Sequence, residues 1–219
     1  MSIVLLHFHT SDFLPLAEKT LKNKTQYAVK HGYPILSKSD NWNNVPIMYE
    51  KAILALNAFE LYPNSEWAFW SDCDSLITNL DIKLENIVRN ETKHFAITTD
   101  INGINAGVFF VRNTAEGRGF MQAMIDSIGR FEHEQDFIKD SYFGSRTYTD
   151  IISLYPQKTF NSYDYNIWGD AYPSGLDYFG NNGRWEHGDF IIHFPGKTLS
   201  ERLSLVDEYL PSKIVNTEH

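Results

Sequence analysis

The first third of the chain alternates between continuous apolar runs and segments whose apolar residues recur at helical spacing. Residues 3–9 form a nearly unbroken apolar run, which is typical of a strand buried on both faces of a sheet. The polar residues 10–12 suit a helix cap, and Pro15 suits the first helical turn. Apolar residues then continue at helical spacing up to Gly32, so we expect a helix that ends there.

The same alternation continues through a second and a third strand. A short strand is expected at residues 33–36, followed by a polar loop at 37–45 and a helix that begins near Pro46. The apolar stripe of that helix comprises Met48, Ala52, Ala55, Leu56 and Phe59. A third strand is expected at residues 67–70. This order of elements predicts a parallel α/β sheet with right-handed crossovers.

The remaining two thirds of the chain has a less regular pattern. We expect strands at residues 94–98, 107–111, 151–155 and 190–194, and helices at 120–128 and 199–209. Residues 156–189 show little periodicity, and long irregular segments are usually functional or disordered. Aromatic residues in this segment argue against disorder. Their rings either form a platform on which the rings of a bound sugar stack, or belong to the core. They are Tyr163, Tyr165, Trp168, Tyr172, Tyr178 and Trp185.

Composition and charge narrow the function classes. The 219 residues include 42 % hydrophobic residues, which is enough for one domain with a sizeable core, and the net charge is −9. A nucleic-acid binder carries a basic patch, whereas the largest basic cluster here, Lys19, Lys22 and Lys24, is expected on an exposed helix face. No segment has the length of a membrane span or the pattern of a signal peptide. The single cysteine, Cys73, suits a reducing compartment, so we expect a cytoplasmic protein.

Two aspartates follow the third expected strand directly. Asp72 and Asp74 flank Cys73, which we interpret as a packing residue because a hard-cation site disfavours thiolate. Ligands of parallel sheets bind beyond the carboxyl ends of the strands, and paired carboxylates suit Mg²⁺ or Mn²⁺. Such an ion would neutralise the leaving diphosphate of a nucleotide sugar. The alternative is a solvated loop or a helix cap.

Five segments together resemble the GT-A glycosyltransferases. They look most like family 34, which includes galactomannan galactosyltransferases, yeast-type mannosyltransferases and xyloglucan xylosyltransferases. The segments are residues 31–33 (HGY), 70–78 (WSDCDSLIT), 105–113 (NAGVFFVRN), 134–136 (EQD) and 193–197 (HFPGK), in the family's order. Family members usually have a longer chain and a membrane anchor. Small glycosyltransferases encoded by large algal viruses also look similar, and a viral origin would place the protein in the host cytoplasm.

The resemblance implies roles for residues around a metal ion and a diphosphate. Asp72 and Asp74 match the carboxylates that bind the metal and the ribose, and His193 matches a histidine that completes the metal shell. Gly196 and Lys197 match a loop that contacts the diphosphate, although the family commonly has a cysteine between this glycine and the cation. Without the resemblance, His193 fits a satisfied strand-end histidine better than a metal ligand, and a solvated loop lysine is the alternative for Lys197.

Four further residues are candidates for the donor pocket. The resemblance places Asn105 and Gly107 in a turn that lines the donor-sugar pocket, while residues 100–107 are also consistent with an ordinary hairpin. Thr10 ends the first expected strand and Lys38 follows the second, so both are placed to contact a nucleotide at the edge of the sheet.

Residues 134–136 determine the expected mechanism. An inverting transferase needs a carboxylate base, such as Glu134 or Asp136, to deprotonate the acceptor hydroxyl. A retaining transferase needs a polar group such as Gln135 beside the anomeric carbon, and Glu134 matches an acidic neighbour of that group. The resemblance favours retention. The alternative is a charged helix start without a catalytic role.

These features together predict a single GT-A-like α/β domain with a mostly parallel central sheet flanked by helices. Its nucleotide half would lie before about residue 110 and its acceptor half after it. The predicted activity is metal-dependent transfer of a sugar from a UDP-linked donor, with Mn²⁺ or Mg²⁺, to a glycan or other hydroxyl acceptor, and no obligate protein partner is inferred.

Two alternatives to this activity stay open. One is a phosphatase that uses the first aspartate as nucleophile, as haloacid-dehalogenase-like proteins do, although those carry the motif on their first strand. The other is a catalytically inactive homologue that only binds nucleotide sugars.

Overall fold

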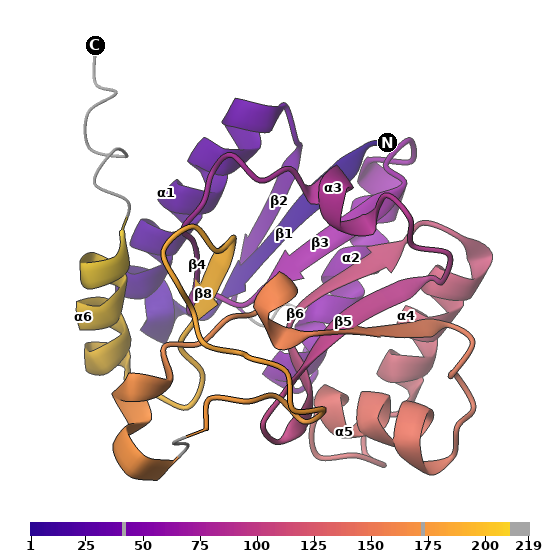
Figure 1. Cartoon of the computed structure of the whole chain (residues 1–219). Helices are drawn as coiled ribbons and strands as arrows, with labels where there is room; N and C mark the ends of the chain where they lie inside the picture. Colours follow the sequence, from indigo (N-terminus) through magenta and orange to yellow (C-terminus); the bar gives the residue numbers. More distant parts are fainter. Residues whose placement is uncertain (41–42, 172–173, 211–219) are drawn as a thin grey trace.

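The computed structural model describes residues 1–40, 43–171 and 174–210. A six-stranded sheet with the order β2-β1-β3-β6-β5-β7 lies at the centre of the molecule (Figure 1). Its strands are β1 (Ile3–His9), β2 (Ile35–Ser39), β3 (Trp67–Ser71), β5 (Phe95–Asp100), β6 (Gly103–Arg112) and β7 (Ile152–Tyr155). β1 pairs in parallel with β2 and β3, and β5 pairs in parallel with β7. β6 is antiparallel to both of its neighbours, so the predicted mostly parallel α/β sheet is confirmed.

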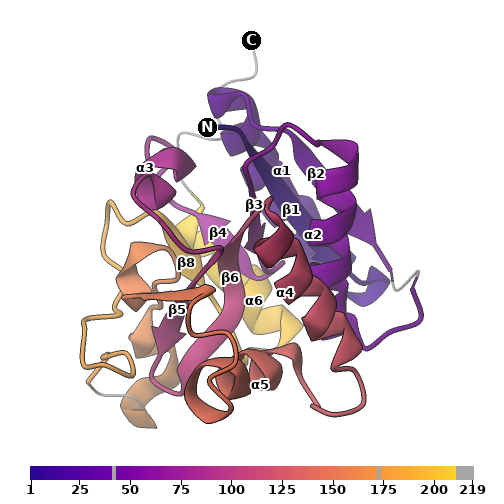
Figure 2. The ribbon, with the colours of Figure 1, turned by 90° about the vertical axis from the view of Figure 1, so that its right-hand side faces the viewer.

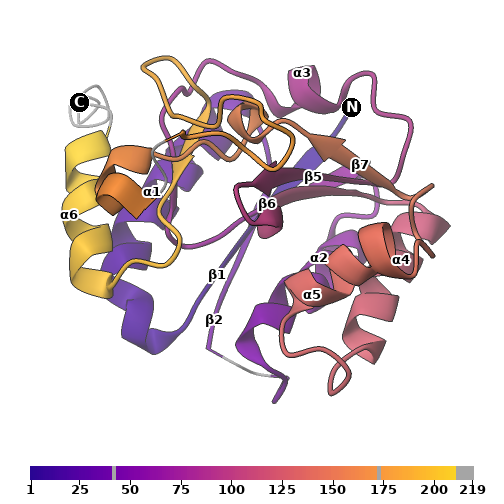
Figure 3. The same cartoon turned by 60° about the horizontal axis from the view of Figure 1, so that its bottom comes forward.

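Helices cover both faces of this sheet. They are α1 (Leu14–His31), α2 (Glu50–Leu61), α3 (Leu84–Val88), α4 (Ala115–Asp126), α5 (Glu134–Lys139) and α6 (Leu199–Tyr209). α2, α4 and α5 pack on one face and lie together in Figure 2. α1 and α3 pack on the other face, and α6 lies against α1 (Figure 3). None of the described helices combines the length and apolarity needed to cross a bilayer.

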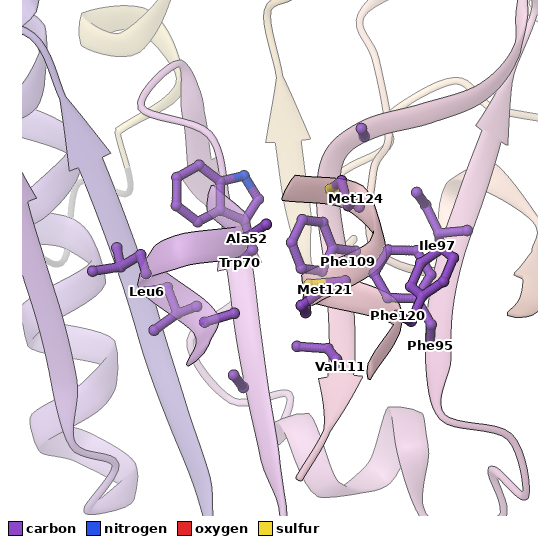
Figure 4. Close-up of a cluster of buried hydrophobic side chains, with 14 of the residues drawn as sticks. Leu6, Ala52, Trp70, Phe95, Ile97, Phe109, Val111, Phe120, Met121 and Met124 are labelled. Atoms are coloured by element: carbon purple, nitrogen blue, oxygen red, sulfur yellow. The ribbon is translucent and has the colours of Figure 1, made fainter. Parts of the chain in front are cut away.

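Alternating side chains along β1 show why both faces are buried. Val4 and Leu6 pack toward α2, whereas Ile3 and Leu5 pack toward α1. Figure 4 shows the first of these two cores, where side chains from the strands meet the methionines of α4. The apolar run at residues 3–9 therefore forms the doubly buried strand that the sequence predicted.

A separate two-stranded sheet forms beside the main one. β4 (Ser75–Ile77) and β8 (Ile191–His193) pair antiparallel, with Ser75 opposite His193. This pairing joins the segment after β3 to a strand near the end of the chain, a long-range contact that positions the site described below.

Three predicted positions differ from the structure. β2 extends to Ser39, so Lys38 lies within the strand and the predicted loop at 37–45 begins later; residues 41–42 lie outside the described part of the chain. A 3₁₀ turn precedes α1, and Thr10 makes no side-chain cap hydrogen bond there. β6 begins at Gly103, so Asn105 and Gly107 lie within a strand of the β5–β6 hairpin and not in a turn.

The prediction of an exposed position is wrong for Lys24. Only 1 % of this residue is exposed, because its side chain reaches from α1 to the end of β3. Its Nζ donates to the carbonyl oxygens of Ser71 and Asp72, each at 2.8 Å. Burial, opposed by the nearby charge of Asp72, lowers the pKa of Lys24 to about 8. These two hydrogen bonds allow the ammonium group to be buried. The sequence pattern does not reveal them, because the acceptors are backbone carbonyl groups.

Candidate functional site

The turn after β3 presents two carboxylates at the carboxyl edge of the main sheet. The backbone N–H of Asp72 donates to the carbonyl oxygen of Gly107 at 2.8 Å, and the N–H of Ser75 donates to the carbonyl oxygen of Asp72 at 3.0 Å. Asp72 is half-buried and Asp74 is buried. These backbone bonds fix both acidic side chains at the end of a rigid strand.

β8 brings His193 to these aspartates. Nε2 of the imidazole lies 3.2 Å from Oδ1 of Asp74. The ring fits because residue 107 is a glycine: a Cβ atom on Gly107 would lie 2.2 Å from Cε1 of His193. Gly107 therefore lies behind the histidine and makes room for it.

A chain of hydrogen bonds determines which ring nitrogen of His193 carries the proton. Oδ1 of Asn105 accepts from the backbone N–H of Gly107 at 3.0 Å, and Nδ2 of Asn161 donates to that same oxygen at 3.0 Å. The oxygen of the Asn161 amide then faces Nδ1 of His193 at 2.9 Å and accepts from it. In the neutral ring, Nδ1 carries the proton and the lone pair of Nε2 faces Asp74.

This arrangement fits a cation between the histidine and the carboxylates. Nε2 of His193 is buried and faces Oδ1 of Asp74, and a lone pair beside a carboxylate oxygen is repulsive unless a proton or a metal cation lies between them. Asp72, Asp74 and His193 each offer a ligand atom within 4.8 Å of the others. Two carboxylates with one imidazole suit Mn²⁺, and they suit Mg²⁺ less well because Mg²⁺ prefers oxygen ligands.

Each aspartate also has a cationic neighbour that the sequence analysis missed. Nε of Arg202, on α6, lies 2.9 Å from Oδ2 of Asp74, and Nζ of Lys51, on α2, lies 3.4 Å from Oδ1 of Asp72. Burial alone would raise the pKa of Asp74, but the protonated form of His193, which carries a charge and donates from Nε2, and then Arg202 outweigh it and lower that pKa. Asp74 is therefore ionised at neutral pH.

Lys51 links the aspartate turn to α5. Its Nζ lies 2.6 Å from Oε1 of Glu134 and donates to the carbonyl oxygen of Ala106 at 2.9 Å. Burial alone would lower the pKa of Lys51, but Asp72 and Glu134 outweigh it and raise that pKa. The sequence held a weak signal for this residue, because Lys51 lies four positions before Ala55 on the buried face of α2. Arg202 has no comparable signal, since only tertiary packing brings α6 to the aspartates.

A cavity of about 550 Å³ opens beside the aspartate turn. It is lined by six of the predicted site residues: Thr10, Asp72, Asp74, Glu134, Gln135 and Asp136. Its lining includes the cationic side chains of Lys51 and Arg202 and the two histidines His9 and His133, and Phe8, Phe13 and Trp70 supply apolar walls. Its size and mixed lining suit a small-molecule ligand.

A second cavity, of about 240 Å³, shares Gln135 with the first. Two more predicted site residues, Asn105 and Gly196, line it together with aromatic side chains. Its buried carboxylate is Asp100, whose Oδ2 accepts from the hydroxyl of Tyr163 and from Nδ2 of Asn105, each at 3.0 Å. Sequence reasoning did not identify Asp100, which ends β5.

The predicted aromatic segment contributes to both the second cavity and the core. Tyr163, Tyr165 and Trp168 line the second cavity. Trp185 instead packs edge-on against Tyr209, with ring centroids 5.0 Å apart. Tyr178 is exposed outside both cavities, and Tyr172 lies outside the described residues.

The three predicted catalytic residues differ in their surroundings. Oε1 of Gln135 accepts from the backbone N–H of Ala106 at 2.9 Å, which fixes its amide between the two cavities. Glu134 is buried and already paired with Lys51. Asp136 is half-buried, with Oδ2 3.5 Å from Nδ1 of His133.

Four predicted site residues line neither cavity, namely Lys38, Gly107, His193 and Lys197. Lys38 lies on the edge strand β2. Nζ of Lys197 donates to the carbonyl oxygen of Ile167 at 2.6 Å and lies 3.6 Å from Oε1 of Glu201. The predicted cation of the diphosphate loop is therefore directed to a backbone carbonyl, and Arg202 is the cation that lines the first cavity beside Asp74.

Comparisons with known proteins agree on one family. The sequence model of the galactosyl transferase GMA12/MNN10 family matches residues 3–93 and 86–202. An alpha-1,2-galactosyltransferase of Schizosaccharomyces pombe is 26 % identical over 255 residues, covering 91 % of this chain and 62 % of that protein. A probable alpha-1,6-mannosyltransferase of Saccharomyces cerevisiae, MNN10, is 22 % identical over 228 residues, covering 81 % of this chain and 54 % of that protein. The chain thus spans roughly three fifths of the length of the curated relatives it matches.

Solved structures confirm the fold. A glycosyltransferase involved in the glycosylation of the major capsid of PBCV-1 superposes with a TM-score of 0.74 at 18 % sequence identity. The superposition covers 95 % of this chain and 100 % of that one. The GT-A fold that the sequence predicted is therefore shown.

Proposed function

The chain belongs to the galactosyl transferase GMA12/MNN10 family, and from this premise we propose that it transfers a hexose from a nucleotide diphosphate sugar to a hydroxyl group of a carbohydrate acceptor. The observation that carries the proposal is the meeting of Asp72, Asp74 and His193 beside a cavity of about 550 Å³. A divalent ion bound there would neutralise the charge that develops on the leaving diphosphate.

We assign the nucleotide diphosphate to the first cavity. Arg202 lines it, and the ion pair with Asp74 holds the guanidinium in place, so this cation needs no reorganisation as charge develops on the phosphates. Phe8 and Phe13 offer apolar surface to a base, while Thr10 lies at a strand end where a ribose hydroxyl would reach it. A uridine diphosphate donor is the form we propose.

We assign the reacting sugars to the region around Gln135, where the two cavities meet. The backbone bond from Ala106 orients the Gln135 amide toward this region. Asn105 and Asp100 in the second cavity are hydrogen-bonding groups for sugar hydroxyls, and the ring of Trp168 offers an apolar face to the acceptor. This assignment departs from a division of the chain at about residue 110, because Arg202 lines the first cavity whereas Asp100 and Asn105 line the second.

We propose transfer with retention of anomeric configuration. An inverting enzyme needs a free carboxylate base near the acceptor, but Glu134 is held in a 2.6 Å ion pair with Lys51. Asp136 lines the first cavity and not the second, and Asp100 in the second cavity is already held by hydrogen bonds from Tyr163 and Asn105. Gln135 is then the polar side chain beside the anomeric carbon, and the leaving diphosphate accepts the proton of the acceptor hydroxyl.

Binding and turnover of donors test this function. We would measure thermal stability with UDP-galactose, UDP-glucose and GDP-mannose, with and without Mn²⁺, since a ligand stabilises in step with its affinity. Release of the nucleotide diphosphate would then be followed with and without sugar acceptors. The proposal expects one donor to stabilise the protein only with the metal and to be consumed slowly even without an acceptor.

Matched controls separate the alternatives. Asp74→Asn is expected to abolish the metal-dependent stabilisation and the turnover. Hydrolysis of phosphate monoesters without use of any nucleotide sugar would favour the phosphatase, which the family match does not support. Tight donor binding without any turnover would favour an inactive homologue.

A further inference from the structure

Three exposed aromatic rings touch one another outside the two cavities. Phe143, Tyr178 and Phe179 have 42 %, 55 % and 56 % of their surface exposed. The ring centroids of Phe143 and Tyr178 lie 5.5 Å apart, and those of Tyr178 and Phe179 lie 5.3 Å apart. We call these three residues the aromatic patch. Contiguous exposed apolar side chains of this kind mark binding surfaces more often than isolated ones do.

A buried carboxylate holds the loop that presents two of these rings. Asp177 is only 3 % exposed, and its Oδ1 accepts from the backbone N–H groups of Phe179 and Asn181, each at 2.9 Å. Its Oδ2 accepts from the backbone N–H of Gln157 at 3.3 Å. The loop is thus fixed with Tyr178 and Phe179 directed to solvent. Such preorganisation reduces the entropy that a ligand must remove on binding.

The aromatic patch lies next to the second cavity. The backbone N–H of Tyr178 donates to the carbonyl oxygen of Asp100 at 2.8 Å, and Asp100 lines that cavity. The ring of Tyr178 also lies against the β5–β6 turn, because its Cδ2 is 4.0 Å from the position of a Cβ atom on Gly103. One short turn therefore separates the aromatic patch from the cavity.

Phe143 connects the aromatic patch to the helix that carries Gln135. It lies in the π-helical turn η3 (Asp140–Gly144), which continues α5. At about 1.5 Å per residue, the eight positions between Gln135 and Phe143 correspond to roughly 12 Å along the helix. Phe143 is thus too far along the helix to contact the sugar that reacts beside Gln135, at a separation that a longer acceptor can span.

We propose that the aromatic patch is a distal acceptor subsite that binds a pyranose ring beyond the ring that reacts. This inference rests on the proposed function and adds the class of acceptor, which is an oligosaccharide or glycan chain and not a monosaccharide. The apolar C–H face of a pyranose packs on an aromatic ring, and its hydroxyl groups remain in water at an exposed site. Three uncharged rings in contact suit a neutral sugar.

Acceptor kinetics test the subsite. Phe143→Ala and Tyr178→Ala would be compared with the native chain on galactotriose and mannotriose, and on the methyl glycosides of galactose and mannose. We expect the acceptor KM for the trisaccharide to rise roughly three- to tenfold, a change the size of an aromatic contact. The kcat, the donor KM and the KM for the methyl glycoside stay unchanged. Leu61→Ala is the control, because Leu61 is 62 % exposed on α2, outside the aromatic patch.

The subsite would be overturned if the substitutions raised the KM for the trisaccharide and for the methyl glycoside equally, or if they changed neither KM. A dimer that light scattering detects and that the two substitutions dissociate would also overturn the subsite, because a second copy of the chain would then occupy the aromatic patch.

Saturation-transfer NMR with the trisaccharides and UDP tests acceptor binding without any need for turnover. In the native chain we expect saturation transfer to a sugar ring of the trisaccharide that does not react, and we expect both variants to lose this signal. Absence of the signal in the native chain would also overturn the subsite. Failure of donor hydrolysis in the native chain would instead refute the proposed function.

Discussion

Gly107 and His193 occupy adjoining space, such that a Cβ atom on Gly107 would lie 2.2 Å from Cε1 of His193. The same glycine accepts a 2.8 Å hydrogen bond from the N–H of Asp72 and donates to Oδ1 of Asn105 at 3.0 Å. β6 thus fixes the position of the aspartate turn and of the His193 ring, although none of its side chains is an expected metal ligand.

Gly107→Ala is therefore expected to weaken metal binding strongly. The added methyl group must displace the imidazole from the carboxylates, and overpacking a buried site also costs about 1–3 kcal/mol of folding stability. Titration calorimetry with Mn²⁺ in the presence of UDP, together with urea unfolding, measures the two effects. Gly119→Ala in α4 is the matched control, because a Cβ atom there meets no atom within 4 Å. Mn²⁺ affinity equal to the native value in Gly107→Ala would contradict this account.

The ion pair between Lys51 and Glu134 is expected to matter for stability more than surface pairs do. Both side chains are buried, at 7 % and 6 % exposure, so Lys51→Met leaves an unpaired buried carboxylate and should cost about 3–5 kcal/mol in urea unfolding. Lys30→Met removes a partner from the exposed pair with Asp81 and should change stability by less than about 1 kcal/mol. A loss as small in Lys51→Met as in Lys30→Met would show that the buried pair does not hold α2 to α5.

Acid is expected to weaken a second polar cluster, away from the proposed site. Burial alone would raise the pKa of Glu91, but hydrogen bonds from the backbone of Lys93 and from Tyr155 and Ser153 outweigh it and lower that pKa. The stabilisation from ionised Glu91 is therefore fully present above the pKa of the unfolded chain, near 4.5, and is lost as pH falls through the lower folded value.

The measurement for Glu91 is a difference between two proteins. The free energy of unfolding of Glu91→Gln should lie up to about 1 kcal/mol below the native value at pH 7, because solvent screens this partly exposed carboxylate. This gap should narrow as pH falls from about 6 to 3, because only the native chain loses the ionised carboxylate. A gap that stays constant over that range would show that ionisation of Glu91 adds nothing.

Substitutions in residues 134–136 distinguish retention from inversion. With retention, Gln135→Ala should lower kcat by at least about tenfold, whereas Asp136→Asn should keep most of the native rate, because the leaving diphosphate takes the proton. Proton NMR of the product would show the anomeric configuration directly. Inactivity of Asp136→Asn combined with an inverted product would assign Asp136 as the general base and reject the retaining mechanism.

Local periodicity predicted the elements better than it predicted the burial of individual charges. β1 and α6 lie where the apolar runs placed them, because β1 is buried along almost its whole length and α6 packs its apolar side chains around the buried Val206. Lys24 was expected in solvent and Lys51 was not noticed, yet both ammonium groups donate to buried backbone carbonyls. Their partners come from β3 and β6, and contacts between distant segments leave little trace in local patterning.

The candidate site shows the same limit. The aspartates could be placed at a strand end from the sequence pattern, but His193 was linked to them only through a family resemblance. The structure supplies the physical reason for their meeting, which is the pairing of β4 with β8. The same resemblance pointed to Lys197 as the phosphate cation, whereas the structure brings Arg202 to Asp74. Residues that act through tertiary packing, such as Arg202 and Asp100, gave no local signal.

Anomalous X-ray diffraction from crystals grown with Mn²⁺ and UDP tests the central claim most directly. We predict one strong manganese peak within bonding distance of carboxylate oxygens of Asp72 and Asp74 and of Nε2 of His193, in contact with the diphosphate. The peak should be absent from crystals of His193→Ala at the same Mn²⁺ concentration. A native crystal with UDP in the first cavity and no manganese peak at these three residues would contradict the claim.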